Sequence, residues 1–175
     1  WDLHRAAAEN RIDIARSLIA RGDNIEAQNN EEETPLHKAV TNRDFGVSRL
    51  LIDHGANVNA VTNSGATPLF LIAGLSKSAE LAHMLIAQGA NVNAIDAAGE
   101  TPLHHAVNNI AQELAHVLIE QGGQVNASDQ DNNTPLHHAV GKNDHKLVQV
   151  LVDNGANVNA INIHGKRPLD AKIEL

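Results

Sequence analysis

Several residue types are absent or rare in this 175-residue chain: it has no cysteine, no tyrosine, one tryptophan and two phenylalanines. Without cysteine there is no disulfide framework and no thiolate chemistry, which fits a reducing compartment. Because aromatic residues make up only 2% of the chain, alanine, leucine, isoleucine and valine must fill the interior, and they suit thin, closely packed layers. No apolar run is long enough to span a bilayer, and no signal or transit peptide is recognisable.

Positive charge is also scarce, since 13 lysines and arginines stand against 21 aspartates and glutamates. The formal net charge is −3 over residues 1–66, −6 over 67–133 and +1 over 134–175. A chain of this charge is a poor ligand for nucleic acid or an anionic membrane, and we expect neither as a partner. Electrostatic steering should instead draw a basic or polar partner to the middle of the chain.

What the sequence does contain is a repeat of 33 or 34 residues along its whole length. The period is carried by six leucines: Leu3, Leu36, Leu69, Leu103, Leu136 and Leu169. Four of them stand in near-copies of the phrase Thr-Pro-Leu-His, at 34–37, 67–70, 101–104 and 134–137, and glycines recur in step at Gly22, Gly55, Gly89, Gly122 and Gly155. Such self-similarity is typical of a stacked-repeat protein rather than of one closed core.

Each repeat predicts two short helices followed by a turn. The threonine of the phrase is a good N-cap, and the proline suits the first helical position. A polar break separates this helix from a second one with helical apolar spacing, such as Leu114 and Leu118, which ends at the recurring glycine. Segments such as 56–60 then lead into a tight turn before the next phrase.

This unit, with its Thr-Pro-Leu-His and Gly-Ala-Asn-Val-Asn-Ala phrases and its period of 33 residues, resembles the ankyrin repeat family over essentially all of the chain. The resemblance implies an all-α fold, a solenoid of stacked helix-turn-helix units with β-hairpin-like turns. We expect a single domain over 1–175, with repeats at about 1–33, 34–66, 67–100, 101–133 and 134–166 and a partial repeat at 167–175. Because the chain begins and ends within a repeat, we interpret it as a piece of a longer protein.

Three departures from the pattern lead to local expectations. Glu32 occupies a turn position that holds glycine in other repeats, so we expect an irregular turn there. Asn132 occupies the same position, where asparagine tolerates left-handed geometry. The third repeat has one extra residue between Leu75 and Glu80, most simply in the loop that joins its two helices.

Eleven histidines raise the question of a metal or catalytic site. The resemblance implies a structural role for His4, His37, His104 and His137, which share one repeat position: the imidazole bonds nearby backbone and ties turns together. The histidines after two of them, His105 and His138, should line the inner surface. We expect no metal there, because cysteine is absent and no nearby carboxylate completes a tetrahedral set. No nucleophile elbow, phosphate-binding loop or zinc-protease motif is present, so we expect no catalytic residue and no cofactor.

The resemblance also implies a concave recognition surface, made by the turn tips and the exposed face of each first helix. Residues at these positions differ from repeat to repeat, whereas the phrase hardly changes, and this contrast separates scaffold from specificity. An apolar centre at Leu71 and Leu75 beside Ala97 and Ala98 would have a polar rim; alternatively, the two leucines pack under the inserted residue. The predicted partner-binding residues are Lys38, Asn42, Asn63, Ser64, Leu71, Leu75, Ala97, Ala98, Glu100, His105, Asn109, Gln130, Asp131, His138 and Lys142.

Taken together, these features predict a non-catalytic, monomeric protein–protein interaction module that binds a protein or peptide in its concave groove. The alternative is a targeting arm of a larger enzyme or effector whose catalytic domain lies outside this sequence, and a purely structural spacer comes third. We expect a cytoplasmic location, with delivery into another cell also compatible with the sequence. The resemblance further implies that asparagines in the turns can be hydroxylated by a suitable oxygenase: Asn59, Asn93, Asn126 and Asn159.

Overall fold

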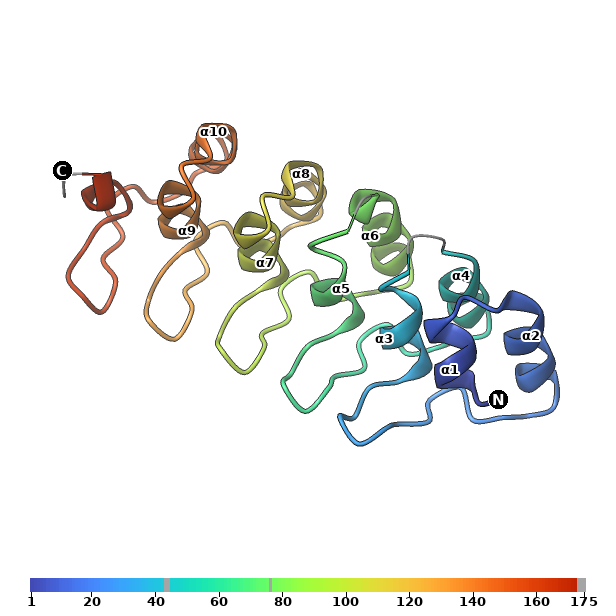
Figure 1. Ribbon diagram of the computed structural model, residues 1–175. Helices are drawn as coiled ribbons and strands as arrows, with labels where there is room; N and C mark the ends of the chain where they lie inside the picture. The colour runs from blue at the N-terminus through green and yellow to red at the C-terminus, as the bar shows by residue number, and fades with distance from the viewer. Residues whose placement is uncertain (43–44, 76, 173–175) are drawn as a thin grey trace. The chain divides into compact units, whose positions relative to one another are not determined.

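The computed structural model describes residues 1–42, 45–75 and 77–172, which form ten α-helices, a final 3-10 helix and no β-strand (Figure 1). The all-α repeat fold is therefore confirmed for this part of the chain. The chain divides into two compact units, Trp1–Asn91 and Val92–Leu175, and each is described by itself. In each unit, hairpin-like turns extend away from the paired helices (Figure 1).

The first unit contains three helix pairs. In chain order the helices are α1 (Leu3–Ala8), α2 (Ile12–Ala20), α3 (Pro35–Ala39), α4 (Gly46–Asp53), α5 (Pro68–Leu71) and α6 (Ser78–Ala87). The first helix of each pair packs against the next, α1 on α3 and α3 on α5, and α2 packs against α4 behind them. Contacts are thus made between neighbouring repeats, as a solenoid requires.

The second unit repeats this arrangement. Its helices are α7 (Pro102–Asn108), α8 (Gln112–Glu120), α9 (Pro135–Gly141), α10 (His145–Asp153) and the 3-10 helix η1 (Pro168–Lys172). Helix α7 packs on α9 and α9 on η1, while α8 packs on α10. No helix within the described residues has the length and apolar character that a bilayer crossing would require.

The predicted caps are confirmed, because the phrase threonine has extended backbone geometry and the proline is in the first helical turn in all four copies. The first repeat lacks this phrase, and there Asp2 caps α1 by accepting a hydrogen bond from the Arg5 N–H at 2.8 Å. In the three copies that contain histidine, a capping box of the threonine side chain and the imidazole satisfies backbone N–H groups at the helix start, whereas Thr67 makes no side-chain cap bond.

The core consists of aliphatic residues, as the composition predicts. The phrase leucines Leu36, Leu69, Leu103 and Leu136 are each at most 1% exposed. Burying a leucine completely stabilises the fold by about 1.5–3 kcal/mol, so these four positions anchor the stack. Leu169, at the same position in the final partial repeat, is 50% exposed.

Five finger tips, as we call the residues at the ends of the hairpin-like turns, share one geometry. They are residues 29–33, 62–66, 96–100, 129–133 and 162–166. In each, the N–H of the first residue donates to the carbonyl of the fifth at 3.0–3.1 Å. The fourth residue has positive φ, and it is glycine in three tips, asparagine in one and glutamate in one.

The prediction of an irregular turn at Glu32 is wrong. Glu32 adopts φ of 58°, close to the 57° of Asn132, and its N–H donates to the Asn29 carbonyl at 3.0 Å as the glycine does elsewhere. The bonds that close the turn outweigh the cost of left-handed geometry for a residue with a Cβ atom, which is of order 1–2 kcal/mol.

The extra residue of the third repeat falls in the loop between α5 and α6, as predicted. Lys77 has φ of 64° and precedes α6, and left-handed Ile110 and Asn143 follow it at steps of 33 residues. The additional residue therefore lies between α5 and Lys77, within 72–76, of which residue 76 lies outside the described residues. Helix α5 is correspondingly short, at four residues.

Candidate functional site

The phrase histidines are part of the scaffold. In the second repeat, His37 Nδ1 accepts hydrogen bonds from the Thr34 N–H at 3.0 Å and the Thr34 hydroxyl at 2.9 Å. Since Nδ1 is an acceptor, the ring proton is on Nε2, which donates to the Ala66 carbonyl at 3.2 Å. Burial lowers the pKa of His37, although these carbonyl bonds oppose the shift, so the ring is neutral at physiological pH.

The same bonds recur in the second unit. His104 and His137 each accept from the threonine three residues earlier, and they bond the carbonyls of Asn133 and Lys166 at 3.2 and 3.1 Å. In the first repeat, His4 Nε2 bonds the Glu33 carbonyl at 2.8 Å. The predicted structural role is confirmed, since each ring ties a first helix to the finger tip that ends the same repeat.

The turn asparagines brace neighbouring turns at three positions. Asn126 is representative: its Nδ2 donates to the Gly155 carbonyl at 3.0 Å, and its Oδ1 accepts from the Asn157 N–H at 2.7 Å. Asn59 and Asn93 make the corresponding pairs of bonds. These amides are therefore committed to the scaffold.

Successive finger tips are also joined through the backbone. The Asn63 N–H donates to the Glu31 carbonyl in the first unit, at 3.1 Å. In the second unit, the N–H of Gln130 donates to Ala98 at 3.1 Å, and that of Ile163 to Asp131 at 2.9 Å. Each link joins a residue to the one 32 positions later, and the side chains of Asn63, Gln130 and Asp131 remain exposed.

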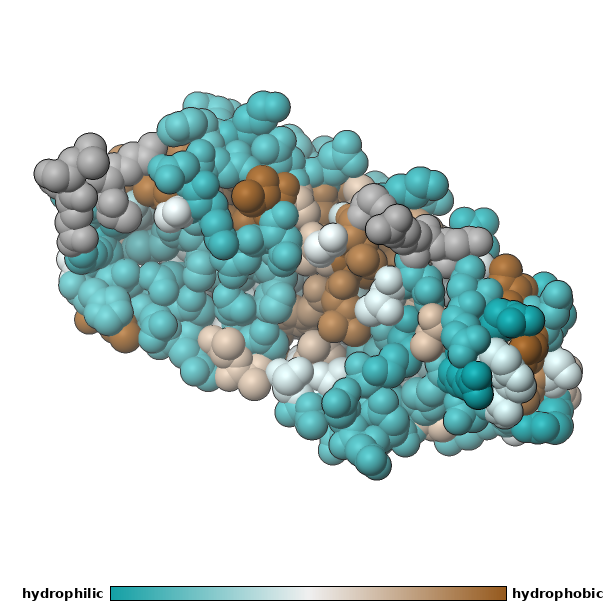
Figure 2. Space-filling model, viewed as in Figure 1, coloured by the Kyte–Doolittle hydropathy of each residue, from teal (hydrophilic) through white to brown (hydrophobic). Residues whose placement is uncertain are grey.

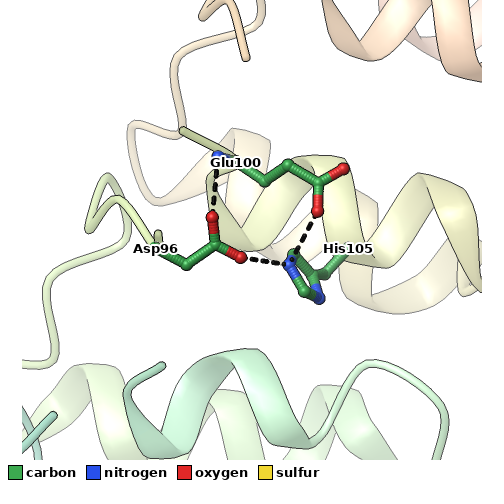
Figure 3. A group of neighbouring side chains, drawn as sticks. All are labelled: Asp96, Glu100 and His105. Carbon is green, nitrogen blue, oxygen red and sulfur yellow. Dashed lines mark hydrogen bonds and ion pairs between the residues drawn. The ribbon is translucent and has the colours of Figure 1, made fainter. Parts of the chain in front are cut away.

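Beside the finger tip 96–100, two carboxylates converge on one imidazole (Figure 3). His105, near the start of α7, has its Nε2 2.9 Å from Asp96 Oδ2 and 3.1 Å from Glu100 Oε2. The other Asp96 oxygen accepts from the backbone N–H groups of Ala98 and Glu100 at 2.9 Å. All three side chains are partly buried, with exposures of 28%, 11% and 19% for His105, Asp96 and Glu100.

A second, overlapping set occurs one repeat later. His138 Nε2 lies 2.9 Å from Asp129 Oδ2, and Glu100 again belongs to the group. Burial opposes ionisation of Asp129, but the hydrogen bonds from His138 and the finger-tip N–H groups outweigh it and lower the pKa of that carboxyl. We expected no nearby carboxylate to complete a tetrahedral set, and the structure places Asp96 and Asp129 each 2.9 Å from a ring nitrogen. Carboxylates in the preceding tip reach the rings because the tip folds back beside the first helix.

The remaining predicted residues lie in or just after the first helices and have varied surroundings. Lys38 forms an ion pair with Glu33 and is partly buried. Asn42 Nδ2 donates to the Ala7 carbonyl at 2.7 Å, and Asn109 Nδ2 to the His105 carbonyl at 2.9 Å, so both amides serve the scaffold. Lys142 is exposed and, with His138, lines a shallow pocket of about 280 Å³.

The predicted apolar centre spans both units, so its two halves are described separately. In the first unit, Leu71 and Leu75 are partly exposed, and an apolar area is visible near α5 (Figure 2). The tip residues Ala97 and Ala98 of the second unit are exposed, as is Ser64 of the first. On the face shown in Figure 2, polar side chains cover most of residues 92–175.

Comparison with known protein families identifies the repeat. A family described as ankyrin repeats in three copies matches residues 3–96 and 70–162. The chain belongs to the ankyrin repeat family. Ankyrin repeats are generally protein–protein interaction modules and typically non-catalytic. A search of curated proteins finds no match for this ankyrin chain.

Sequence reasoning about the ankyrin repeats missed Asp96 and Asp129. The first residue of a finger tip serves the turn, and Asn29, Thr62 and Asn162 do so equally well at the same position. One signal was available in the sequence. Asp96 stands nine residues before His105, and Asp129 stands nine residues before His138. Lys38 and Leu71 stand at that distance from Asn29 and Thr62.

Proposed function

We propose that this ankyrin-repeat chain is a non-catalytic binding module that captures a protein or peptide partner as a monomer. The binding surface is formed by the exposed faces of the first helices and by the finger tips. Its predicted cytoplasmic location and its organisation as one domain over 1–175 stay predictions.

One observation carries this proposal: the first helices hold both recurring residues that bond within the scaffold and variable residues that reach solvent. In three repeats the phrase threonine and histidine make the same hydrogen bonds, and these side chains are buried except for the half-buried His137. The residue that follows the histidine, or Phe70 in the third repeat, is arginine, lysine, leucine, histidine and histidine in successive repeats, and none of these side chains is fully buried. A scaffold needs uniformity, whereas a recognition surface needs variation at solvent-accessible positions.

Within this surface, the first unit offers apolar area at Leu71 and Leu75 beside exposed polar tip residues Asn63 and Ser64. The second unit offers Lys142, the partly exposed His138, and the exposed tip residues Gln130 and Asp131. An apolar anchor surrounded by polar groups is how modest protein interfaces are organised. Asn42 and Asn109 contribute less, because their amides are already bonded within the chain.

The test compares surface variants with a matched control. Leu75→Glu in the first unit and Lys142→Glu in the second place a carboxylate on the proposed surface. Val152→Glu places one on α10, where Val152 is 40% exposed on a second helix. Circular dichroism should show an unchanged fold for all three, and cross-linked partners would be identified by mass spectrometry.

We expect Leu75→Glu or Lys142→Glu to release a partner that wild type and Val152→Glu both retain. A partner retained by both surface variants and lost by Val152→Glu would place recognition on the second helices and refute the proposal. The targeting-arm alternative would be supported by a catalytic domain in any sequence that flanks this chain.

A further inference from the structure

The group formed by Asp96, Glu100 and His105 has the donor types and the spacing of a metal site. One oxygen of each carboxylate and one nitrogen of the ring all lie within 4.8 Å of one another (Figure 3). Two ligands of one ion with bonds of about 2.0–2.1 Å lie about 3.0–3.4 Å apart in octahedral or tetrahedral geometry. The Nε2 to oxygen distances of 2.9 and 3.1 Å are thus near coordination spacing.

The ring alone leaves this arrangement incomplete. Nε2 can carry only one N–H, so it can donate fully to only one of the two carboxylates that approach it. The sequence between Lys77 and Lys142 contains no lysine or arginine, so this stretch supplies no permanent cation of its own. One oxygen of each carboxylate lies within 4.8 Å of the other, and a cation between them would offset their mutual repulsion.

The second repeat shows what occupies the corresponding place when the chain supplies the cation. Lys38 stands at the position of His105 and Glu33 at that of Glu100, and they form an ion pair. Burial opposes ionisation of Glu33, but the Lys38 ammonium and the Asn29 amide outweigh it and hold the pKa of Glu33 below its ordinary value. In the fourth repeat an imidazole replaces the ammonium.

The finger tip does not need the charge of Asp96 to close its turn. The negative charge at this position is therefore not explained by the turn itself. Asn29 makes the same two tip bonds, accepting from the N–H groups of Glu31 and Glu33 at 2.9 and 3.0 Å. In this chain, a carboxylate takes the place only in the two tips that are followed, nine residues later, by a histidine. The paired occurrence of Asp96 and His105 is therefore additional to the scaffold.

We propose that Asp96, Glu100 and His105 bind one divalent transition-metal ion of the zinc type. An imidazole nitrogen with two carboxylate oxygens suits zinc and its neighbours better than magnesium or calcium, which prefer oxygen alone. Backbone N–H groups hold the other oxygen of Asp96, and Asn108 Nδ2 donates to the other oxygen of Glu100 at 3.0 Å. Such outer contacts fix ligand orientation.

The ion is assigned to this set rather than to the overlapping one at His138. The carboxylates of Asp96 and Glu100 both lie within ion-pair distance of His105 Nε2. The ion pair of His138 is with one carboxylate, that of Asp129. The site does not depend on the proposed capture of a partner, and it is tested with the metal alone.

The experiment is calorimetric titration of the full chain with zinc chloride at about pH 7.5. Wild type should bind one ion per chain, with magnesium and calcium giving no comparable binding. Two variants have internal precedents for folding: Asp96→Asn copies Asn29, and His105→Lys copies Lys38. Each should lower zinc affinity at least about 10-fold, because each removes one ligand. In wild type, zinc should also shift the imidazole nitrogen resonances of His105.

The matched control is His116→Ala on α8, an exposed histidine whose helix also carries Glu113 and Glu120. It should bind zinc as wild type does. The proposal is overturned if wild type binds no zinc, if His105→Lys binds as well as wild type, or if His116→Ala loses as much affinity. Loss in His138→Ala but not in His105→Lys would assign the ion to the other set and refute the site as stated.

Discussion

Replacing His37 by alanine tests whether the phrase histidine stabilises the stack through its hydrogen bonds. The change removes the bonds to the Thr34 N–H, the Thr34 hydroxyl and the Ala66 carbonyl. Each such bond contributes about 1 kcal/mol net, so their loss alone lowers the free energy of unfolding by about 3 kcal/mol. His37 is fully buried, so lost packing adds to this.

Urea unfolding followed by circular dichroism measures the effect, and the matched control is His83→Ala. His83 is exposed on α6 of the same unit, so its replacement should change stability by less than about 0.5 kcal/mol. Amide exchange gives a local readout, since the Thr34 N–H should exchange faster in the His37 variant. A cost below about 1 kcal/mol, or one equal to that of His83→Ala, would show that the ring bonds are not the stabilising contacts.

The pH dependence gives a second readout from the same variant. Burial holds the pKa of folded His37 below its ordinary value of 6.5, so the unfolded chain takes up the proton first as the pH falls. The stabilisation is therefore complete above about pH 6.5 and is lost as the pH drops below it. The stability difference between wild type and His37→Ala should shrink between about pH 7.5 and pH 5. A difference that grows on acidification would contradict the neutral ring.

Two further substitutions test the turns. Asn126→Ala removes the bonds to Gly155 and Asn157 and should cost about 1–2 kcal/mol in urea unfolding. Asn159→Ala is its control, because within the described residues the Asn159 side chain has no such pair of bonds; equal costs would refute the bracing role. Glu32→Gly should raise the thermal midpoint and stabilise the chain by about 1 kcal/mol, because glycine adopts positive φ without strain. A lower midpoint would show that the Glu32 side chain contributes more than its backbone strain costs.

The helices and caps were predictable because the signals that determine them are local. Thr34 and Pro35 stand side by side, and their N-cap and first-turn roles follow from their own chemistry. The role of His37 was predictable for another reason, since one residue type at the same position in several repeats points to a bond that the scaffold repeats. The family match confirms the fold that these signals indicated.

The pairing of Asp96 with His105 was not predictable in the same way. A turn accounts for an aspartate at that position by itself, so nothing local suggested a second partner nine residues later. Asn42 was assigned to partner binding because of its place on the helix, but the adjacent repeat brings the Ala7 carbonyl within 2.7 Å of its amide. Contacts that depend on how one layer lies on the next are set by tertiary geometry, which a helical pattern does not specify.

The backbone links between finger tips determine where this chain can lengthen. The Gln130 N–H reaches the Ala98 carbonyl and the Ile163 N–H reaches that of Asp131, always at the same offset. A residue added inside the tip 129–133 would shift this tip against both neighbouring tips, so the backbone hydrogen bonds to each of them would be disrupted. A residue added between paired helices shifts no tip against another, and the single insertion of this sequence is found in such a loop. Growth during evolution, or by design, should therefore be accepted in the helix-joining loops and rejected in the fingers.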